Sequence, residues 1–348
     1  MASESHSPEK SVRQCNPILV EAIKGNAVDN FYRGSYSVVD AHGHVIMSVG
    51  DTERPVFPGS GIKPIQALAL CETGAAKAYG LGHANVALAC SNHNGTPTHT
   101  EIIENWLHKI DCSHEDLVCG VSDRVSKKRK EHISTSGGVI DSLHDPCSGK
   151  HTGFLTVARH LRHTTLGYNR MDHPVQQRVI GTLEQMTGLD LYDAPKALDG
   201  SGIPTIGIPL GNISLAMARM ANPHDQPEER QAACKRIITA MTMEPYLLAG
   251  KGKFTTRVIE ALGQSCIIQM GSQGVYCGSL VTKGIGIAIK IDDGSSRAAE
   301  AVMMRLLYKL NILTERALGL LLNLLEPPIF SRNGEVIGTV KPAYADLK

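Results

Sequence analysis

A serine and a lysine three residues apart are the first side chains in this sequence whose types and spacing could do chemistry. They are Ser60 and Lys63, in the segment 57–64, which reads FPGSGIKP. If Pro64 opens a helix, the two lie about one turn apart on the same face. Burial would lower the pKa of the lysine, and its neutral amine could take the serine proton near a helix N-terminus that stabilises negative charge. The pair predicts a serine nucleophile with a lysine general base; a capping serine beside a surface lysine is the plainer alternative.

The segment 147–151, which reads CSGKH, is the second candidate. Ser148 and Gly149, placed before a helix, can form a turn that binds an anion. Cys147 and His151 are side-chain types that ligate metals. Of these two interpretations, the sequence favours a capping turn over a metal site.

Two further groups of polar residues stand at predicted turns. The segment 199–205, DGSGIPT, offers the carboxylate of Asp199 and the hydroxyl of Ser201 on a flexible backbone, although a plain loop explains it equally well. His93 follows an apolar run that ends at Cys90. A histidine in that place can be catalytic, but a structural histidine is favoured.

The composition indicates a small-molecule partner. Lys and Arg number 35 against 34 Asp and Glu, so the net charge of +1 leaves no electrostatic footprint for nucleic acid or an anionic membrane. Aromatic residues make up only 4%, which argues against base stacking. The nine cysteines include no CxxC pair, and the polar N-terminus precedes no apolar signal segment. We therefore expect reduced cysteines and a cytoplasmic location.

Predicted strands lie near both ends of the sequence, and predicted helices lie between them. The strands form a hairpin over 35–49 and continue over 266–269, 275–280 and 285–290. The helices cover 64–79, 98–110, 150–161, 173–187 with Asp172 as N-cap, 227–242 and 296–310, and a loop or lid covers 120–146. This order predicts an α/β fold of the α+β type, with one antiparallel sheet formed by N- and C-terminal segments and a helical region packed against it.

The expected organisation is one domain between two tails. We expect a disordered tail over 1–16, a single catalytic domain over 17–326 and an irregular C-terminal tail over 327–348. The active site should lie between the sheet and the helical region.

Together the motifs resemble the bacterial-type (Rhizobium-like) L-asparaginase II family, and order and spacing fit from roughly residue 20 to 312. The matching segments are FPxSxxKPxQAL at 57–68, LAC at 88–90, CSGKH at 147–151, DHPVQQ at 172–177, DGxGxPT at 199–205, AGxG at 249–252, GVYC at 274–277 and KIDDG at 290–294.

The resemblance implies a fold similar to serine β-lactamases and glutaminases, in a homodimer. It implies that Ser60 is the nucleophile and Lys63 its partner. It further implies a second Ser–Lys pair, and a metal site built from two cysteines and the lysine of the CSGKH segment, here Lys150.

This chain departs from the family pattern at its polar positions. The second serine falls at Asn92, its partner lysine at Gln269, and the second metal-site cysteine at Ser201. Asn92 and Gln269 can hydrogen-bond to each other, but neither can relay a proton. The loss of a thiolate should weaken zinc strongly, so we expect no cofactor and treat Cys147 and Lys150 as remnants. The remaining departures replace an arginine, an acidic residue and an aspartate of the family by Gly59, Gln273 and Thr255.

Three functions follow as hypotheses. The first is a diverged serine amidohydrolase that acts on a small amino-acid-derived amide, with Ser60 as nucleophile and Lys63 as general base. The second is a biosynthetic enzyme of specialised metabolism that uses the same pocket for condensation, cyclisation, isomerisation or elimination. The third is a non-catalytic binding protein. The expected substrate-binding residues are Asn92, His93, Lys150, Asp199, Gly200, Ser201 and Gln269.

Overall fold

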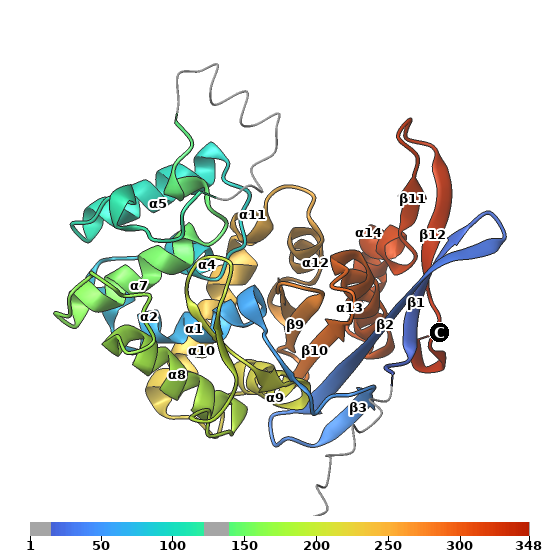
Figure 1. Ribbon diagram of the computed structural model, residues 1–348, viewed down its shortest axis with the longest axis horizontal. Helices are drawn as coiled ribbons and strands as arrows, with labels where there is room; N and C mark the ends of the chain where they lie inside the picture. Colours follow the sequence, from blue (N-terminus) through green and yellow to red (C-terminus); the bar gives the residue numbers. More distant parts are fainter. Residues whose placement is uncertain (1–14, 122–138, 348) are drawn as a thin grey trace, which may run out of the picture.

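The centre of the fold is an antiparallel sheet built from both ends of the chain; the computed structural model describes residues 15–121 and 139–347. The strand order is β11-β12-β1-β2-β10-β9-β8, with β3 paired to β2, so the first strands lie between the last ones (Figure 1). This confirms the predicted fold class. The strands are β1 (Ile18–Lys24), β2 (Ala27–Asp40), β3 (Val45–Val49), β8 (Cys266–Met270), β9 (Val275–Leu280), β10 (Ile285–Ile291), β11 (Pro328–Phe330) and β12 (Val336–Pro342).

The middle of the chain forms a helical region beside this sheet (Figure 1). The helices are α1 (Lys63–Gln66), α2 (Leu68–Glu72), α3 (Ala75–Ala78), α4 (His83–Ala89), α5 (Pro97–Lys109), α7 (Ser148–His160), α8 (Pro174–Thr187), α9 (Leu210–Ala221), α10 (Glu228–Met243), α11 (Pro245–Ala249), α12 (Phe254–Leu262), α13 (Ser296–Lys309) and α14 (Glu315–Leu325). Short strand pairs join β4 (Pro55–Val56) to β7 (Ile208–Pro209) and β5 (Lys196–Leu198) to β6 (Pro204–Ile206). A 3-10 turn, η1 (Gly59–Ile62), precedes α1.

Helices α9 and α13 cover opposite faces of the sheet. A Cβ on Gly286 of β10 would lie 1.9 Å from the Ser214 carbonyl oxygen of α9, so only glycine allows this approach. A Cβ on Gly278 of β9 would face Met303 of α13. Gly278 pairs with Ile287, the residue after Gly286, and successive strand residues point to opposite faces. The strands are therefore buried on both sides.

Two details of the helical prediction were wrong. The helix expected over 64–79 is divided into α1, α2 and α3, and Gly74, with a left-handed φ of 78°, separates α2 from α3. The N-cap of α8 is His173, whose ring accepts a hydrogen bond from the Val175 amide, and not Asp172. The apolar run before His93 forms the end of helix α4.

The prediction of an irregular tail from Pro327 was also wrong. Strand β12 pairs with β1 from Val20 opposite Pro342 to Lys24 opposite Gly338. Val340 is the one fully buried residue of β12, and therefore the strand lacks the alternating apolar pattern that sequence reasoning relies on. The tail expected over 1–16 and the loop or lid over 120–146 fall largely on 1–14 and 122–138, outside the described residues.

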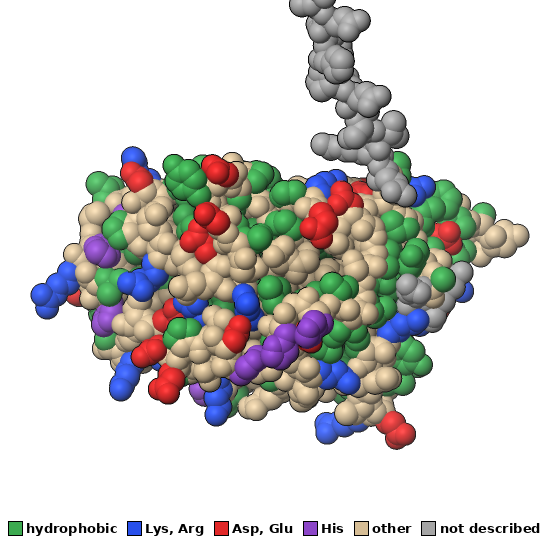
Figure 2. Space-filling view, turned by 90° about the horizontal axis from the view of Figure 1, so that it is seen from below, with side chains coloured by type: hydrophobic (Ala, Val, Ile, Leu, Met, Phe, Trp, Pro, Cys, Tyr) green, Lys and Arg blue, Asp and Glu red, His purple; other side chains and the backbone are tan. Residues whose placement is uncertain are grey.

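The surface shows no single dominant charge on the face in Figure 2, where acidic and basic side chains alternate. Within the described ranges, no helix has both the length and the apolar character needed to cross a bilayer.

Candidate active site

Ser60 lies on the turn η1, which is pressed against the end of strand β8. A Cβ on Gly271, the residue after β8, would lie 2.5 Å from the Pro58 carbonyl oxygen, and one on Gly61 would lie 3.0 Å from the Cys277 sulfur. The glycines of the FPGSG segment and of the β8 end therefore let the two backbones touch. This contact holds half-buried Ser60 at the boundary between the sheet and the helical region.

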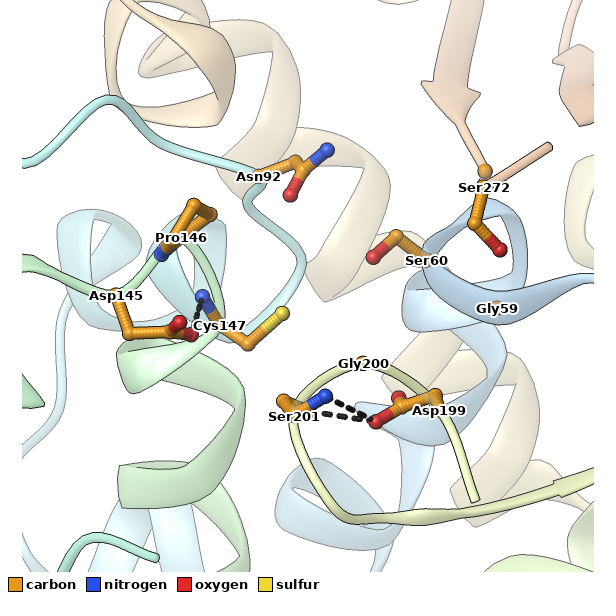
Figure 3. Close-up of a pocket in the computed structure, with 11 residues that line it drawn as sticks. Gly59, Ser60, Asn92, Asp145, Pro146, Cys147, Asp199, Gly200, Ser201 and Ser272 are labelled. Atoms are coloured by element: carbon orange, nitrogen blue, oxygen red, sulfur yellow. Dashed lines mark hydrogen bonds between the residues drawn. The ribbon is translucent and has the colours of Figure 1, made fainter. Parts of the chain in front are cut away.

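Ser60 lines a cavity of about 120 Å³. Figure 3 shows the side chains of Ser60, Asn92 and Cys147 converging on one space from η1, from the segment after α4 and from the start of α7. The lining residues are Gly59, Ser60, Asn92, Asp145, Pro146, Cys147, Asp199, Gly200, Ser201, Gly271 and Ser272.

Lys63 is completely buried behind this cavity. Its side-chain nitrogen Nζ donates to the Ser91 carbonyl oxygen and contacts Cys147. Burial lowers the pKa of Lys63 and outweighs the opposing effect of Cys147, and nearby Lys150 lowers the pKa further. Among the described contacts, no hydrogen bond joins the Ser60 hydroxyl to the Lys63 nitrogen.

Asp199 holds the turn at the floor of the cavity. Its Oδ2 accepts from Lys150 Nζ at 2.6 Å, and its Oδ1 accepts from the Ser201 amide and the Ser201 hydroxyl, both at 2.8 Å. Burial alone would raise the pKa of Asp199, but the Lys150 ammonium and the Ser201 donors outweigh it and hold the pKa well below its usual range. Asp199 is therefore a fixed anion.

Two buried histidines orient this polar framework. His151 lies between the Tyr168 hydroxyl, 2.7 Å from Nδ1, and the Ser201 hydroxyl, 3.0 Å from Nε2. His93 Nε2 lies 2.9 Å from the Ser148 hydroxyl. Burial lowers the pKa of both histidines well below its ordinary value, so both are neutral near pH 7. Their contacts fix Ser201 and the start of α7.

The structure brings together most of the residues expected from the sequence. Ser60, Asn92, Asp199, Gly200 and Ser201 line the cavity, while Lys63 and Lys150 are buried behind it. His93 lines a neighbouring cavity instead.

Gln269 does not reach the cavity wall. It is buried on β8, and no hydrogen bond joins it to Asn92 in the described part of the chain, where its Oε1 has no hydrogen-bond partner. The pairing of these two side chains that the sequence allowed is therefore not formed.

Sequence reasoning missed four lining residues: Asp145, Pro146, Gly271 and Ser272. Asp145 and Pro146 directly precede the CSGKH segment, and Gly271 and Ser272 directly follow a predicted strand. Their position beside recognised segments is the signal that could have found them. Only the contact between η1 and the β8 end makes Ser272 part of the site.

The residues at the family's metal position do not fit a zinc ion. Lys150 donates to Asp199 at 2.6 Å, and an ammonium in such a pair has no lone pair for a metal. The hydroxyl of Ser201 is engaged by Asp199 and His151. Across the described ranges, no group of three or more His, Cys, Asp or Glu side chains could hold a metal ion.

Two solved structures are similar to this chain. A β-lactamase from Mycobacterium bovis has 13% identity and a TM-score of 0.39, over 84% of this chain and 95% of its own. A candidate β-lactamase from Bacteroides dorei DSM 17855 has 13% identity and a TM-score of 0.40, over 74% of this chain and 84% of its own. A likeness at these scores carries no inference about function.

A family model matches most of the chain. No curated protein matches the chain by sequence. The model of the L-asparaginase II family matches residues 20–342, which include every residue of the cavity. The chain belongs to the L-asparaginase II family.

Proposed function

We propose that this protein is a serine amidohydrolase that acts on a small amino-acid-derived amide, with Ser60 as nucleophile and Lys63 as general base. The observation that carries the proposal is the buried Lys63 behind a cavity into which Ser60 points. Membership of the L-asparaginase II family supports an amidohydrolase type of role. The small cavity, walled by amide, hydroxyl and carboxylate groups, supports a small polar substrate.

The proposed reaction uses the lowered pKa of Lys63. A neutral amine that donates one N–H to the Ser91 carbonyl keeps its lone pair for the Ser60 proton. The Ser60 oxygen then attacks the amide carbonyl, and Lys63 returns the proton to the nitrogen that leaves as ammonia. Water adds to the acyl group on Ser60 by the same proton transfers and releases the acid. The hydrogen bond between Ser60 and Lys63 would form with substrate bound, because catalytic hydrogen bonds often tighten only then.

Two backbone amides are suited to stabilise the oxyanion. They belong to Ser60, in the first turn of η1, and to Ser272, whose nitrogen lies 3.5 Å from where a Cβ on Gly59 would be. Ser60 and Ser272 both line the cavity. Asn92 can donate to the substrate carbonyl and accept from its amide nitrogen, which positions the scissile group.

Ammonia release tests the proposal, and two serines of the same cavity make a matched pair of variants. The purified protein is incubated with asparagine, glutamine and a panel of amino-acid amides. Ser60→Ala should reduce release about 10³-fold or more, because the nucleophile is lost. Ser272→Ala should stay within about tenfold of the unmodified protein, because its backbone N–H remains.

The contrary results are equally specific. If Ser60→Ala released ammonia at the unmodified rate, Ser60 would not be the nucleophile. If a molecule shown to occupy the cavity carried an amide that was never hydrolysed, the amidohydrolase proposal would fail in favour of the biosynthetic or binding hypothesis.

A further inference from the structure

A second and larger cavity adjoins the one at Ser60. It has a volume of about 310 Å³ and shares Asn92 and Pro146 with the first cavity as common wall. The two cavities therefore adjoin at Asn92 and Pro146. The lining residues are Asn92, His93, Asn94, His144, Pro146, Ala249, Lys253, Phe254, Thr255, Met270, Ser296 and Glu300.

One cation and one acid stand free in this second cavity. Lys253 is the exposed N-cap residue of α12, and Glu300 is a half-buried residue of α13. Among the described contacts, neither side chain makes a hydrogen bond or an ion pair, and no ion pair within 4.0 Å joins the two. Both charges are therefore available to a ligand.

The surroundings of Glu300 favour a bound cation. Burial raises the pKa of Glu300 to about 7, while Lys253 and Arg297 act in the opposite direction. A half-buried carboxyl without a partner gains from an ammonium group of a ligand. The neighbouring His93 is held neutral by burial and does not compete as a cation.

Two other polar side chains of the second cavity already have hydrogen-bond partners within the protein. Thr255, where the family resemblance gives an aspartate, lies 2.5 Å from the Tyr276 hydroxyl and carries no charge. His144 is paired with Asp141 at 2.9 Å. The charge pattern offered to a ligand is thus one carboxyl and one ammonium on opposing helices α13 and α12.

We propose that the second cavity binds the zwitterionic amino-acid head of the substrate, with its α-amino group at Glu300 and its α-carboxylate at Lys253. The acyl chain passes Asn92 and Pro146 and presents its carbonyl to Ser60. The substrate class is therefore an amide whose amino-acid head is separated from the scissile carbonyl by two or more carbons. The chemistry at the carbonyl rests on the proposed function, whereas the binding of the head does not.

The test measures binding in the Ser60→Ala protein, where no turnover occurs. Three probes of equal length are compared by calorimetry. Glutamine carries both charges of the head, glutaramate lacks the α-amino group, and 4-aminobutanamide lacks the α-carboxylate. Each is titrated into Ser60→Ala alone and with Glu300→Gln or Lys253→Met added.

The expected pattern is crossed. Glu300→Gln should weaken the binding of glutamine and of 4-aminobutanamide about tenfold, and should leave the binding of glutaramate unchanged. Lys253→Met should weaken the binding of glutamine and of glutaramate by a similar factor, and should leave the binding of 4-aminobutanamide unchanged. Lys251→Met and Glu260→Gln replace exposed residues outside the cavity and should change nothing.

Every other outcome overturns the inference. Equal binding by all variants, losses that ignore the charge of the probe, or no binding of any probe would each do so. If the crossed pattern appears while the unmodified protein releases no ammonia from glutamine or longer amides, the head site stands and the amidohydrolase proposal fails.

Discussion

At the scale of single residues, the proposed catalysis depends on Lys63 more than on Ser60. The Ser60 hydroxyl needs only exposure to the cavity, whereas a lysine acts as a base only when its pKa is lowered. Full burial supplies that lowering, and the contacts with Ser91 and Cys147 hold the amine in place.

Replacement of Lys63 should separate catalysis from folding. Lys63→Met should reduce kcat about 10²- to 10⁴-fold. It should change the free energy of unfolding by less than about 2 kcal/mol, because a buried amine is exchanged for an apolar chain and one hydrogen bond is lost. Steady-state kinetics and urea unfolding measure the two quantities. Lys77→Met, at an exposed lysine of α3, is the control.

The pH dependence of activity should reflect the lowered pKa of Lys63. The base form of Lys63 increases as pH rises, and its lowered pKa moves that rise below the usual lysine range. Activity should therefore increase with pH through a limb that disappears in Lys63→Met. A large loss of stability with unchanged kcat would instead give Lys63 a structural role.

Much of the residue scale was predictable, and the reason for the rest is spatial. Ser60 and Lys63 are three residues apart in the sequence, and this spacing indicates a candidate catalytic pair. Ser272 joins the first cavity from the segment after β8, and Glu300 joins the second from α13; both segments are distant in the sequence, and only tertiary packing brings them close. Gln269 was assigned by resemblance, yet its strand turns it away from the cavity.

At the scale of elements, β12 shows where the amino-acid pattern was too weak to read. It reads VIGTVKP, with one fully buried residue, Val340, and an exposed Val336. Its place in the sheet comes from backbone pairing with β1 rather than from a buried face. Strands β9 and β10 are buried on both sides, and their continuous apolar runs made them predictable.

These two valines of β12 make a matched test. Val340→Ala should lower the free energy of unfolding by about 1–3 kcal/mol, because it opens a cavity between the edge of the sheet and α13. Val336→Ala, with 65% of the side chain exposed, should stay within about 0.5 kcal/mol. Urea unfolding measures both values. Equal small effects would mean that β12 is not part of the folded sheet in solution.

At the scale of the whole molecule, the site exists because the C-terminal part of the chain folds back to pair with the N-terminal strands. The sheet takes strands from both ends, and the helical middle closes against the β8 end, so Ser60, Asn92, Cys147 and Asp199 meet from four separate segments (Figure 3). The fold class was predictable from the order of strands and helices. The second cavity was not, because its walls come from α11, α12 and α13 as well as from the helical middle.

The central claim is that Ser60 forms the covalent bond to the acyl group, and mass spectrometry can observe that bond. The protein is incubated with a p-nitrophenyl ester that carries the acyl group of its best amide, quenched in acid and mapped by peptide. We expect one acyl group on Ser60, absent from Ser60→Ala and retained in Ser272→Ala. An acyl group on Cys147 or Lys63 instead, with Ser60 unmodified, would contradict the account.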